Sequence, residues 1–188
     1  MEIRDAKGLT EREFLEAYAK KDYPRPYLTA DIILFSENKS HVLLVKRKGH
    51  PYIGKWALPG GFARSDEKVS ETASRELYEE TGIDDAADMG LEAVGLFSKP
   101  GRDPRGWVVS EAYMAMTMKE RVVLKAGDDA AEARWFRIVY ENDNDYAPLS
   151  LVNGDISLHV NYGSSDLAFD HGEILIEALK RFIYRSKE

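Results

Sequence analysis

The sequence has no cysteine in its 188 residues, which excludes disulfide bonds and thiolate metal sites. It also lacks long apolar runs: none approaches the roughly 18 to 20 residues of a membrane-spanning helix, and the charged N-terminal residues are unlike a signal peptide. The formal charge of −7 argues against general binding to nucleic acids or anionic membranes. We therefore expect a cytoplasmic protein whose partners are small molecules and cations.

The amino-acid composition is that of an ordinary globular protein, with 44% hydrophobic and 31% charged residues. A chain of this length is long enough to bury a core and is short for two full domains. We expect an N-terminal helical extension over residues 1–26 and one domain over residues 27–188.

The start of the chain predicts a helix over residues 10–20. Thr10 and Glu13 have the spacing of a capping box. The apolar side chains of Phe14, Leu15 and Tyr18 share one face of that helix. The prolines of "DYPRP" end it, because proline removes a backbone donor and disfavours helical geometry in the residue before it.

The remaining pattern interleaves many strands with few helices, which favours the α/β class. The runs "LTADIILF" and "HVLLVKR" flank the turn-like "SENKS" and predict a hairpin. Asn153 and Gly154 between two apolar runs predict a second hairpin. A final helix is expected over residues 171–185, with Asp170 at its N-cap.

The stretch "GGFARSDEKVSETASRELYEETGI", residues 60–83, concentrates carboxylates on a predicted helix, although like charges three or four residues apart repel. At about 100° per residue, Glu80 falls near 20° and Glu76 near 340°, facing the apolar arc that starts at Val69. On the same scale Glu79 falls near 280° and Glu67 near 160°. The position of Glu67 is opposite the apolar arc, so we expect it to be solvated and to have a structural role.

Inward carboxylates need a proton, a basic partner or a cation. Glu76 and Glu80, one turn apart, can both reach one Mg²⁺, which prefers oxygen ligands. The alternative is a surface network in which Arg75 pairs with Glu71 and Glu79 at helical i,i+4 spacing, and the two arrangements can coexist.

Gly61, Glu67 and residues 75–83, "RELYEETGI", resemble the Nudix box at every defined position. The resemblance implies an α/β/α sandwich around a mixed β-sheet. "WALPGGF", "PGRDPRG", "AGDDAAEARWF" and "LAFDH" are similar to a bacterial branch that contains ADP-ribose pyrophosphatases. This branch implies hydrolysis of ADP-ribose to AMP and ribose 5-phosphate with Mg²⁺ or Mn²⁺.

The resemblance also assigns roles to residues of this stretch. It implies that Glu76, Glu80 and the carbonyl of Gly60 hold the metal. Glu79 then binds a further ion or takes part in catalysis, and Arg75 orients the carboxylates.

The general base is expected in a loop beyond the box, as in related pyrophosphatases. Asp128 and Asp129 are the first candidates, followed by Glu132, Glu120 and Glu111. Each of these carboxylates can equally be a solvated loop or turn charge.

Substrate contacts are expected outside the box. Arg102 and Arg105 lie in "GRDPRG", and the planar guanidinium suits phosphate oxygens. The alternative is that Arg102 pairs with Asp103 on the surface. Phe62 can stack on adenine or belong to the core, and His171 can contact phosphate or cap the last helix.

Two other functions remain open. One is a Nudix hydrolase of another nucleotide, such as a nucleoside diphosphate sugar, a dinucleotide coenzyme or an oxidised nucleotide. The other is a regulator that senses ADP-ribose and carries a winged helix, for which the sequence up to Glu188 leaves no room. We therefore expect no nucleic-acid binding, and relatives suggest a homodimer built partly by the N-terminal segment.

Overall fold

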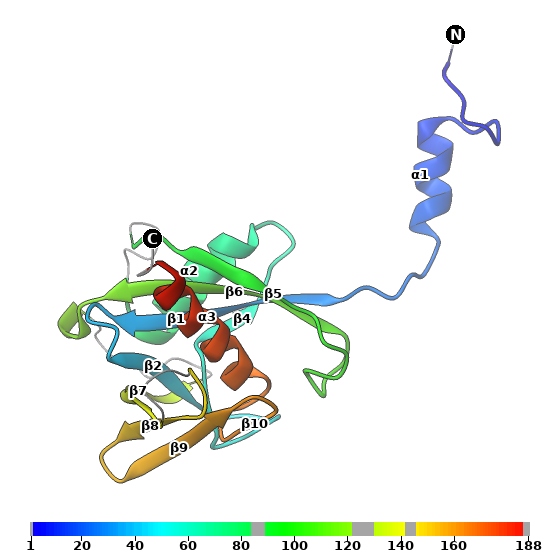
Figure 1. Ribbon diagram of the computed structural model, residues 1–188. Helices are drawn as coiled ribbons and strands as arrows, with labels where there is room; N and C mark the ends of the chain where they lie inside the picture. Colours follow the sequence, from blue (N-terminus) through cyan, green and yellow to red (C-terminus); the bar gives the residue numbers. More distant parts are fainter. Residues whose placement is uncertain (1, 84–88, 122–129, 142–145, 186–188) are drawn as a thin grey trace.

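The computed structural model describes residues 2–83, 89–121, 130–141 and 146–185 (Figure 1). Within these ranges the strands form one sheet in the order β10-β9-β8-β7-β2-β1-β6-β5. β1 (Tyr27–Ser36) pairs in parallel with β6 (Val108–Thr117), and β2 (His41–Arg47) pairs antiparallel with β7 (Ala130–Tyr140). The sheet is therefore mixed. The other strands of the path are β5 (Glu92–Phe97), β8 (Leu149–Asn153), β9 (Ile156–Asn161) and β10 (Ser164–Ser165).

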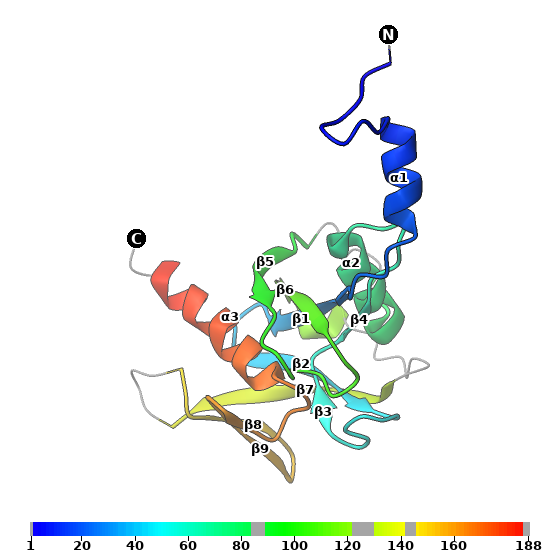
Figure 2. The same ribbon diagram turned by 90° about the vertical axis from the view of Figure 1, so that its right-hand side faces the viewer.

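One helix covers each face of this sheet, as the two views together show (Figures 1 and 2). Successive residues of β1 point to opposite faces. Ile32 packs in the cluster that contains residues of α2 (Val69–Thr81), and Ile33 packs in the cluster that contains residues of α3 (His171–Arg185). The predicted α/β/α arrangement around a mixed sheet is thus confirmed. No helix among the described residues is long and apolar enough to cross a membrane.

The predicted hairpin of β1 and β2 exists, but it is open. The two strands are registered only at Phe35 and Val42, close to their turn. Farther from the turn, β3 (Trp56–Ala57) pairs with β2, and β4 (Gly60–Phe62) pairs with β1. The segment that leads to α2 therefore enters the opened hairpin, and this opening forms the floor of a cavity.

The later elements follow the sequence prediction. β8 and β9 form a hairpin in which Asn153 pairs with Ile156, and Gly154 in the turn has a φ of 56°. Such a positive φ favours glycine. α3 begins at His171, as predicted.

The N-terminal helix α1 (Glu11–Ala19) stands clear of the domain in both views (Figures 1 and 2). Its predicted capping box is present: Thr10 Oγ accepts from the Glu13 N–H at 3.2 Å, and Glu13 accepts from the Thr10 N–H at 2.8 Å. α1 has no buried residue. Its apolar face is therefore uncovered within the described chain, and Leu15 is 55% exposed.

Candidate functional site

A cavity of about 540 Å³ lies between α2, the opened β1–β2 hairpin, the β5–β6 loop and the residues that precede α3. It gathers segments that are far apart in the sequence. Glu79 is outside its lining, and Asp128 and Asp129 lie outside the described residues. Of the residues that the sequence singles out, the cavity is lined by Gly60, Phe62, Arg75, Glu76, Glu80, Arg102, Arg105 and His171.

The glycine pair of β4 lies directly against the carboxylates of α2. A Cβ atom on Gly61 would lie 2.3 Å from Glu76 Oε1, and one on Gly60 would lie 2.2 Å from the Ala30 carbonyl oxygen. The Gly60 N–H donates to Glu80 Oε2 at 3.1 Å. The predicted inward direction of Glu76 and Glu80 is therefore observed, and only glycine allows this close approach.

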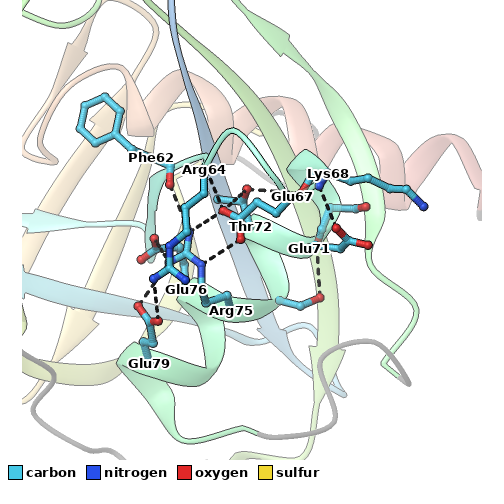
Figure 3. A network of polar contacts seen from close by, with 11 residues as sticks. Phe62, Arg64, Glu67, Lys68, Glu71, Thr72, Arg75, Glu76 and Glu79 are labelled. Atoms are coloured by element: carbon cyan, nitrogen blue, oxygen red, sulfur yellow. Dashed lines mark hydrogen bonds and ion pairs between the residues drawn. The ribbon is translucent and has the colours of Figure 1, made fainter.

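Arg75 joins the carboxylates of this region, as Figure 3 shows. Its Nε and Nη2 donate to the two oxygens of Glu67 at 3.1 and 2.7 Å. Its Nη1 donates to Glu76 at 2.5 Å and to Glu79 at 3.3 Å. Nη2 also donates to the Phe62 carbonyl at 3.1 Å. One guanidinium thus fixes the Glu76 carboxylate between α2 and β4.

The predicted solvated position of Glu67 is wrong. α2 begins only at Val69, so Glu67 lies in the preceding turn and the helical angle does not apply to it (Figure 3). Its side chain is 14% exposed, and it accepts from the Arg64 N–H and from Thr72 Oγ, both at 2.9 Å. Hydrogen bonds from Arg75, followed by that from the Arg64 N–H, lower the pKa of Glu67 to about 2.

The surface-network alternative holds in part. Arg75 does pair with Glu79, but Glu71 accepts from the Lys68 N–H at 2.8 Å at the start of α2. Glu79 is 48% exposed, and its carboxylate lies 3.7 Å from the Arg64 guanidinium. Glu76 is 14% exposed, and burial raises its pKa although Arg75 acts against this change.

The oxygen atoms of Glu76, Glu80 and Gly60 are suitable ligands for a hard divalent cation. Two carboxylates and a backbone carbonyl are all-oxygen ligands, as Mg²⁺ and Mn²⁺ prefer. Across the described ranges, no group of three or more His, Cys, Asp or Glu side chains is arranged to hold a metal. A cation between Glu76, Glu80 and Gly60 would therefore keep water ligands, as Mg²⁺ usually does.

Arg102 lies inside the protein, and its residue is only 8% exposed. Its Nε and Nη2 donate to the two oxygens of Asp170 at 2.8 and 2.6 Å, and Nη2 donates to Asp31 at 3.3 Å. The alternative of a surface pair with Asp103 is wrong, because Asp103 pairs with Arg105 instead. Arg102 thus joins the β5–β6 loop to β1 and to the start of α3.

His171 lies in the cavity wall, although its residue is only 4% exposed. Nδ1 accepts from the Leu58 N–H at 2.8 Å, so the proton of the neutral ring is on Nε2. Nε2 lies 3.6 Å from Asp31 Oδ1, and Ser110 Oγ donates to Asp31 Oδ2 at 2.6 Å. Burial lowers the pKa of His171 below its ordinary value, although the nearby carboxylates of Asp31 and Asp170 act against this change.

Arg105 lies at the cavity rim, where its side chain is 40% exposed. The centre of its guanidinium is 4.7 Å from the Phe62 ring and 5.4 Å from the Phe169 ring. Nε and Nη2 donate to Asp103, whose side chain is 2% exposed. Burial acts to raise the pKa of Asp103, but hydrogen bonds from Arg105 hold it below its usual value.

Two of these residues were missed in the sequence. Asp31 is the charged residue within the apolar run "LTADIILF", and that charge was an available signal. Phe169 lines the cavity and lies in "LAFDH", whose resemblance was an available signal, but nothing in that segment indicates its φ of 54°. Of the later candidates for the general base, the cavity lining in the described part of the chain contains none of Glu111, Glu120 and Glu132.

Comparison with known proteins agrees with this geometry. Residues 25–143 match the protein family described as the NUDIX domain. The chain is 39% identical over 133 residues to an ADP-ribose pyrophosphatase of Methanocaldococcus jannaschii, covering 71% of this chain and 73% of that protein. It is 34% identical over 176 residues to the ADPR responsive transcriptional repressor NtrR of Acinetobacter baylyi. That match covers 92% of this chain and 60% of the repressor, so the chain spans less than two thirds of that relative.

Solved structures show the same relationship. A MutT/nudix family protein from Enterococcus faecalis superposes with a TM-score of 0.77 at 36% identity, covering 93% of this chain and 70% of that one. The NUDIX domain of Shewanella oneidensis NrtR, complexed with ADP ribose, superposes with a TM-score of 0.68 at 28% identity, covering 93% and 99%. The chain therefore belongs to the Nudix family of hydrolases.

Proposed function

We propose that the chain hydrolyses the diphosphate bond of a nucleoside diphosphate derivative, and that ADP-ribose is its substrate. The observation that carries this proposal is the contact of Glu76 and Glu80 with the glycine pair of strand β4, inside a cavity that arginines also line. Similarity to an ADP-ribose pyrophosphatase and to a domain complexed with ADP ribose supports the choice of substrate.

Mg²⁺, or Mn²⁺ in its place, would be held by Glu76, Glu80 and the carbonyl of Gly60, with Glu79 as a candidate for a further ion. When bound, such a cation neutralises diphosphate charge and activates water. Arg75 keeps the Glu76 carboxylate against Gly61, so the ligand is in place before the substrate arrives.

In the proposed reaction, the oxygen of a water molecule bonds to one phosphorus while the bridging P–O bond breaks. ADP-ribose then yields AMP and ribose 5-phosphate, and the water proton passes to a carboxylate, for which Asp128 and Asp129 remain the proposed acceptors. Arg105 and Phe62 at the rim are the proposed substrate contacts. Arg102 and His171 bond to buried partners, and we propose that they support the cavity wall instead.

The test is an assay of a nucleotide panel with Mg²⁺, with the products identified. The panel contains ADP-ribose, a nucleoside diphosphate sugar, a dinucleotide coenzyme and an oxidised nucleotide. ADP-ribose should give the highest kcat/KM, and a chelator should abolish turnover. Glu80→Gln is the control, because it removes ligand charge with little change of shape and should lower kcat at least about a hundredfold. A higher kcat/KM for another panel member would show that this nucleotide, and not ADP-ribose, is the preferred substrate.

An ADP-ribose-sensing regulator is the second candidate, favoured by the similarity to the repressor NtrR over 92% of this chain. A hydrolase turns ADP-ribose over, whereas a regulator binds it without turnover. We expect AMP to accumulate from ADP-ribose and mobility-shift assays to show no sequence-specific DNA binding. Tight ADP-ribose binding without turnover would favour the regulator.

We further propose that residues 1–26 are an extension through which two copies form a homodimer, with residues 27–188 as the hydrolase domain. α1 has 9 residues and none is buried, whereas isolated helices shorter than about 12 to 15 residues are marginal in water. Its exposed apolar face therefore needs a partner surface. Phe14→Glu combined with Leu15→Glu should convert the dimer to a monomer in sedimentation equilibrium, and a wild-type monomer would refute the proposal.

A further inference from the structure

We propose that Asp31 is a positioning residue of the site. Its buried carboxylate borders Gly60 of β4 on one side and, through Arg102, holds the cavity wall formed by residues 169–171 on the other. As far as turnover is concerned, this inference rests on the proposed function. It also joins three sequence segments, "LTADIILF", "GRDPRG" and "LAFDH", in one buried cluster.

The cluster is tightly enclosed. The side chains of Asp31 and Asp170 are each 10% exposed, Arg102 is 4% exposed and His171 is 6% exposed. Arg102 donates to both carboxylates, so one guanidinium serves Asp31 and Asp170. Removal of one member of a buried ion pair leaves an uncompensated charge in a low dielectric, which is strongly unfavourable. The cluster therefore resists displacement of any of its members.

The first arm of the cluster reaches the wall of the cavity. The planar fork of Arg102 holds both oxygens of Asp170, a geometry that fixes direction as well as distance. Asp170 follows Phe169, whose φ of 54° is costly for a bulky residue and persists only where the surroundings impose it. The anchored Asp170 and His171 supply that constraint. They hold the Phe169 ring in the cavity wall, 4.9 Å from the guanidinium of Arg47.

The second arm reaches the proposed metal ligands. Asp31 pairs with Gly60 in the antiparallel register of β1 and β4. A Cβ atom on Gly60 would lie 3.0 Å from Asp31 Oδ1, so the carboxylate closely borders β4 at Gly60. Gly60 in turn donates its N–H to Glu80. A displacement of Asp31 would therefore reach Gly60 and Glu80, whereas a displacement of Asp170 acts on the wall alone.

The test compares Asp31→Asn with Asp170→Asn by two measurements that need no turnover. The Kd for Mn²⁺ is measured by electron paramagnetic resonance of the free ion, and the Kd for AMP by calorimetry. Asp170→Asn should weaken AMP binding about tenfold and leave the Mn²⁺ Kd within about twofold. Asp31→Asn should weaken both about tenfold. The double variant should bind AMP no more weakly than the weaker single variant, because both act through one arm.

A milder pair of variants covers the case in which Asp31→Asn fails to fold. Ser110→Ala removes one hydrogen bond to Asp31 without leaving an unpaired charge, and should weaken both ligands about two- to fivefold. Ser36→Ala is the matched control: Ser36 is also buried and hydrogen-bonded, but to Asn38 at the far end of β1. It should change neither Kd.

An unchanged Mn²⁺ Kd in Asp31→Asn and Ser110→Ala would overturn the proposal. So would additive losses of AMP affinity in the double variant. A merely structural role would lower the melting temperature and leave both Kd values unchanged, which also counts against it. If the wild type binds Mn²⁺ and AMP but does not hydrolyse ADP-ribose, the proposed function fails while these measurements still decide the role of Asp31.

Discussion

Arg102 grips Asp170 through both oxygens of its carboxylate, at 2.8 and 2.6 Å, although the two residues are 68 positions apart in the chain. The pair joins the β5–β6 loop to the residue that precedes α3. Asp31 of β1 is the third member, because it also accepts from Arg102. Arg105, three residues further on, lies at the rim instead, with 40% of its side chain exposed. The two arginines of "GRDPRG" therefore take different roles, which the following predictions separate.

Arg102→Ala should act on stability. The change leaves Asp31 and Asp170 buried without their cation, a situation that costs about 3 to 5 kcal/mol in other buried pairs. The free energy of unfolding from urea denaturation measures this loss. Arg134→Ala is the control, because its pair with Glu132 is more than a third exposed at Arg134 and should contribute no more than about 1 kcal/mol. Equal losses in both variants would contradict the buried role of Arg102.

Arg105→Ala should act on substrate use. If its guanidinium binds a phosphate of ADP-ribose, kcat/KM should fall about tenfold to a hundredfold, and Arg105→Lys should recover only part of this loss. Asp103→Asn is the companion variant, since it weakens the tether of Arg105 but keeps the guanidinium. It should cost much less activity. Wild-type kinetics in Arg105→Ala would remove this residue from the site.

Gly61→Ala should separate activity from folding. The new Cβ would lie 2.3 Å from Glu76 Oε1, which is the end of a flexible side chain that can move away. Stability should therefore change little, while kcat falls at least about a hundredfold because the carboxylate leaves its place. Gly49→Ala is the matched control for stability, as nothing lies within 4 Å of its Cβ position. Retained activity in Gly61→Ala would show that the Glu76 position is not critical.

His171 should make the fold sensitive to mild acid. Its folded-state pKa lies below the ordinary 6.5, so the unfolded chain takes up a proton as the pH falls below 6.5 while the folded chain resists it. Stability is therefore full above pH 6.5 and decreases below it. His171→Asn keeps an acceptor for the Leu58 N–H and does not titrate. Between pH 7.5 and 5.5, the melting temperature of the wild type should fall more than that of the variant; parallel decreases would assign the effect to other groups.

The sequence predicts best what depends on neighbours in the chain. The inward direction of Glu76 and Glu80 follows from helical period, which holds once the helix exists. The same period fails for Glu67, because the helix begins two residues later and boundaries are less well specified than helix interiors. The capping box at Thr10 and the turn at Gly154 are local as well, and both are confirmed.

Features that depend on distant partners could not be predicted. Nothing near Arg102 shows that Asp31 and Asp170 will enclose it, because the parallel pairing of β1 with β6 and the placement of α3 bring these residues together. The charge of Asp31 in an apolar strand was missed; it signals a buried partner but does not identify one. Asp128 and Asp129 stay predictions, since they lie outside the described residues.

The opened hairpin of β1 and β2 allows the loop that follows β2 to vary in length independently of α2. β3 and β4 fill the inner edges of the two strands, so residues 48–55 form a loop that is joined to the sheet at both ends and adds no strand to it. Gly49 and His50 of this loop line the cavity. Insertions or deletions there can alter the room for a ligand without shifting the register of any strand or moving α2. Variants of this loop length would therefore change the shape of the cavity while α2 and its carboxylates stay in place.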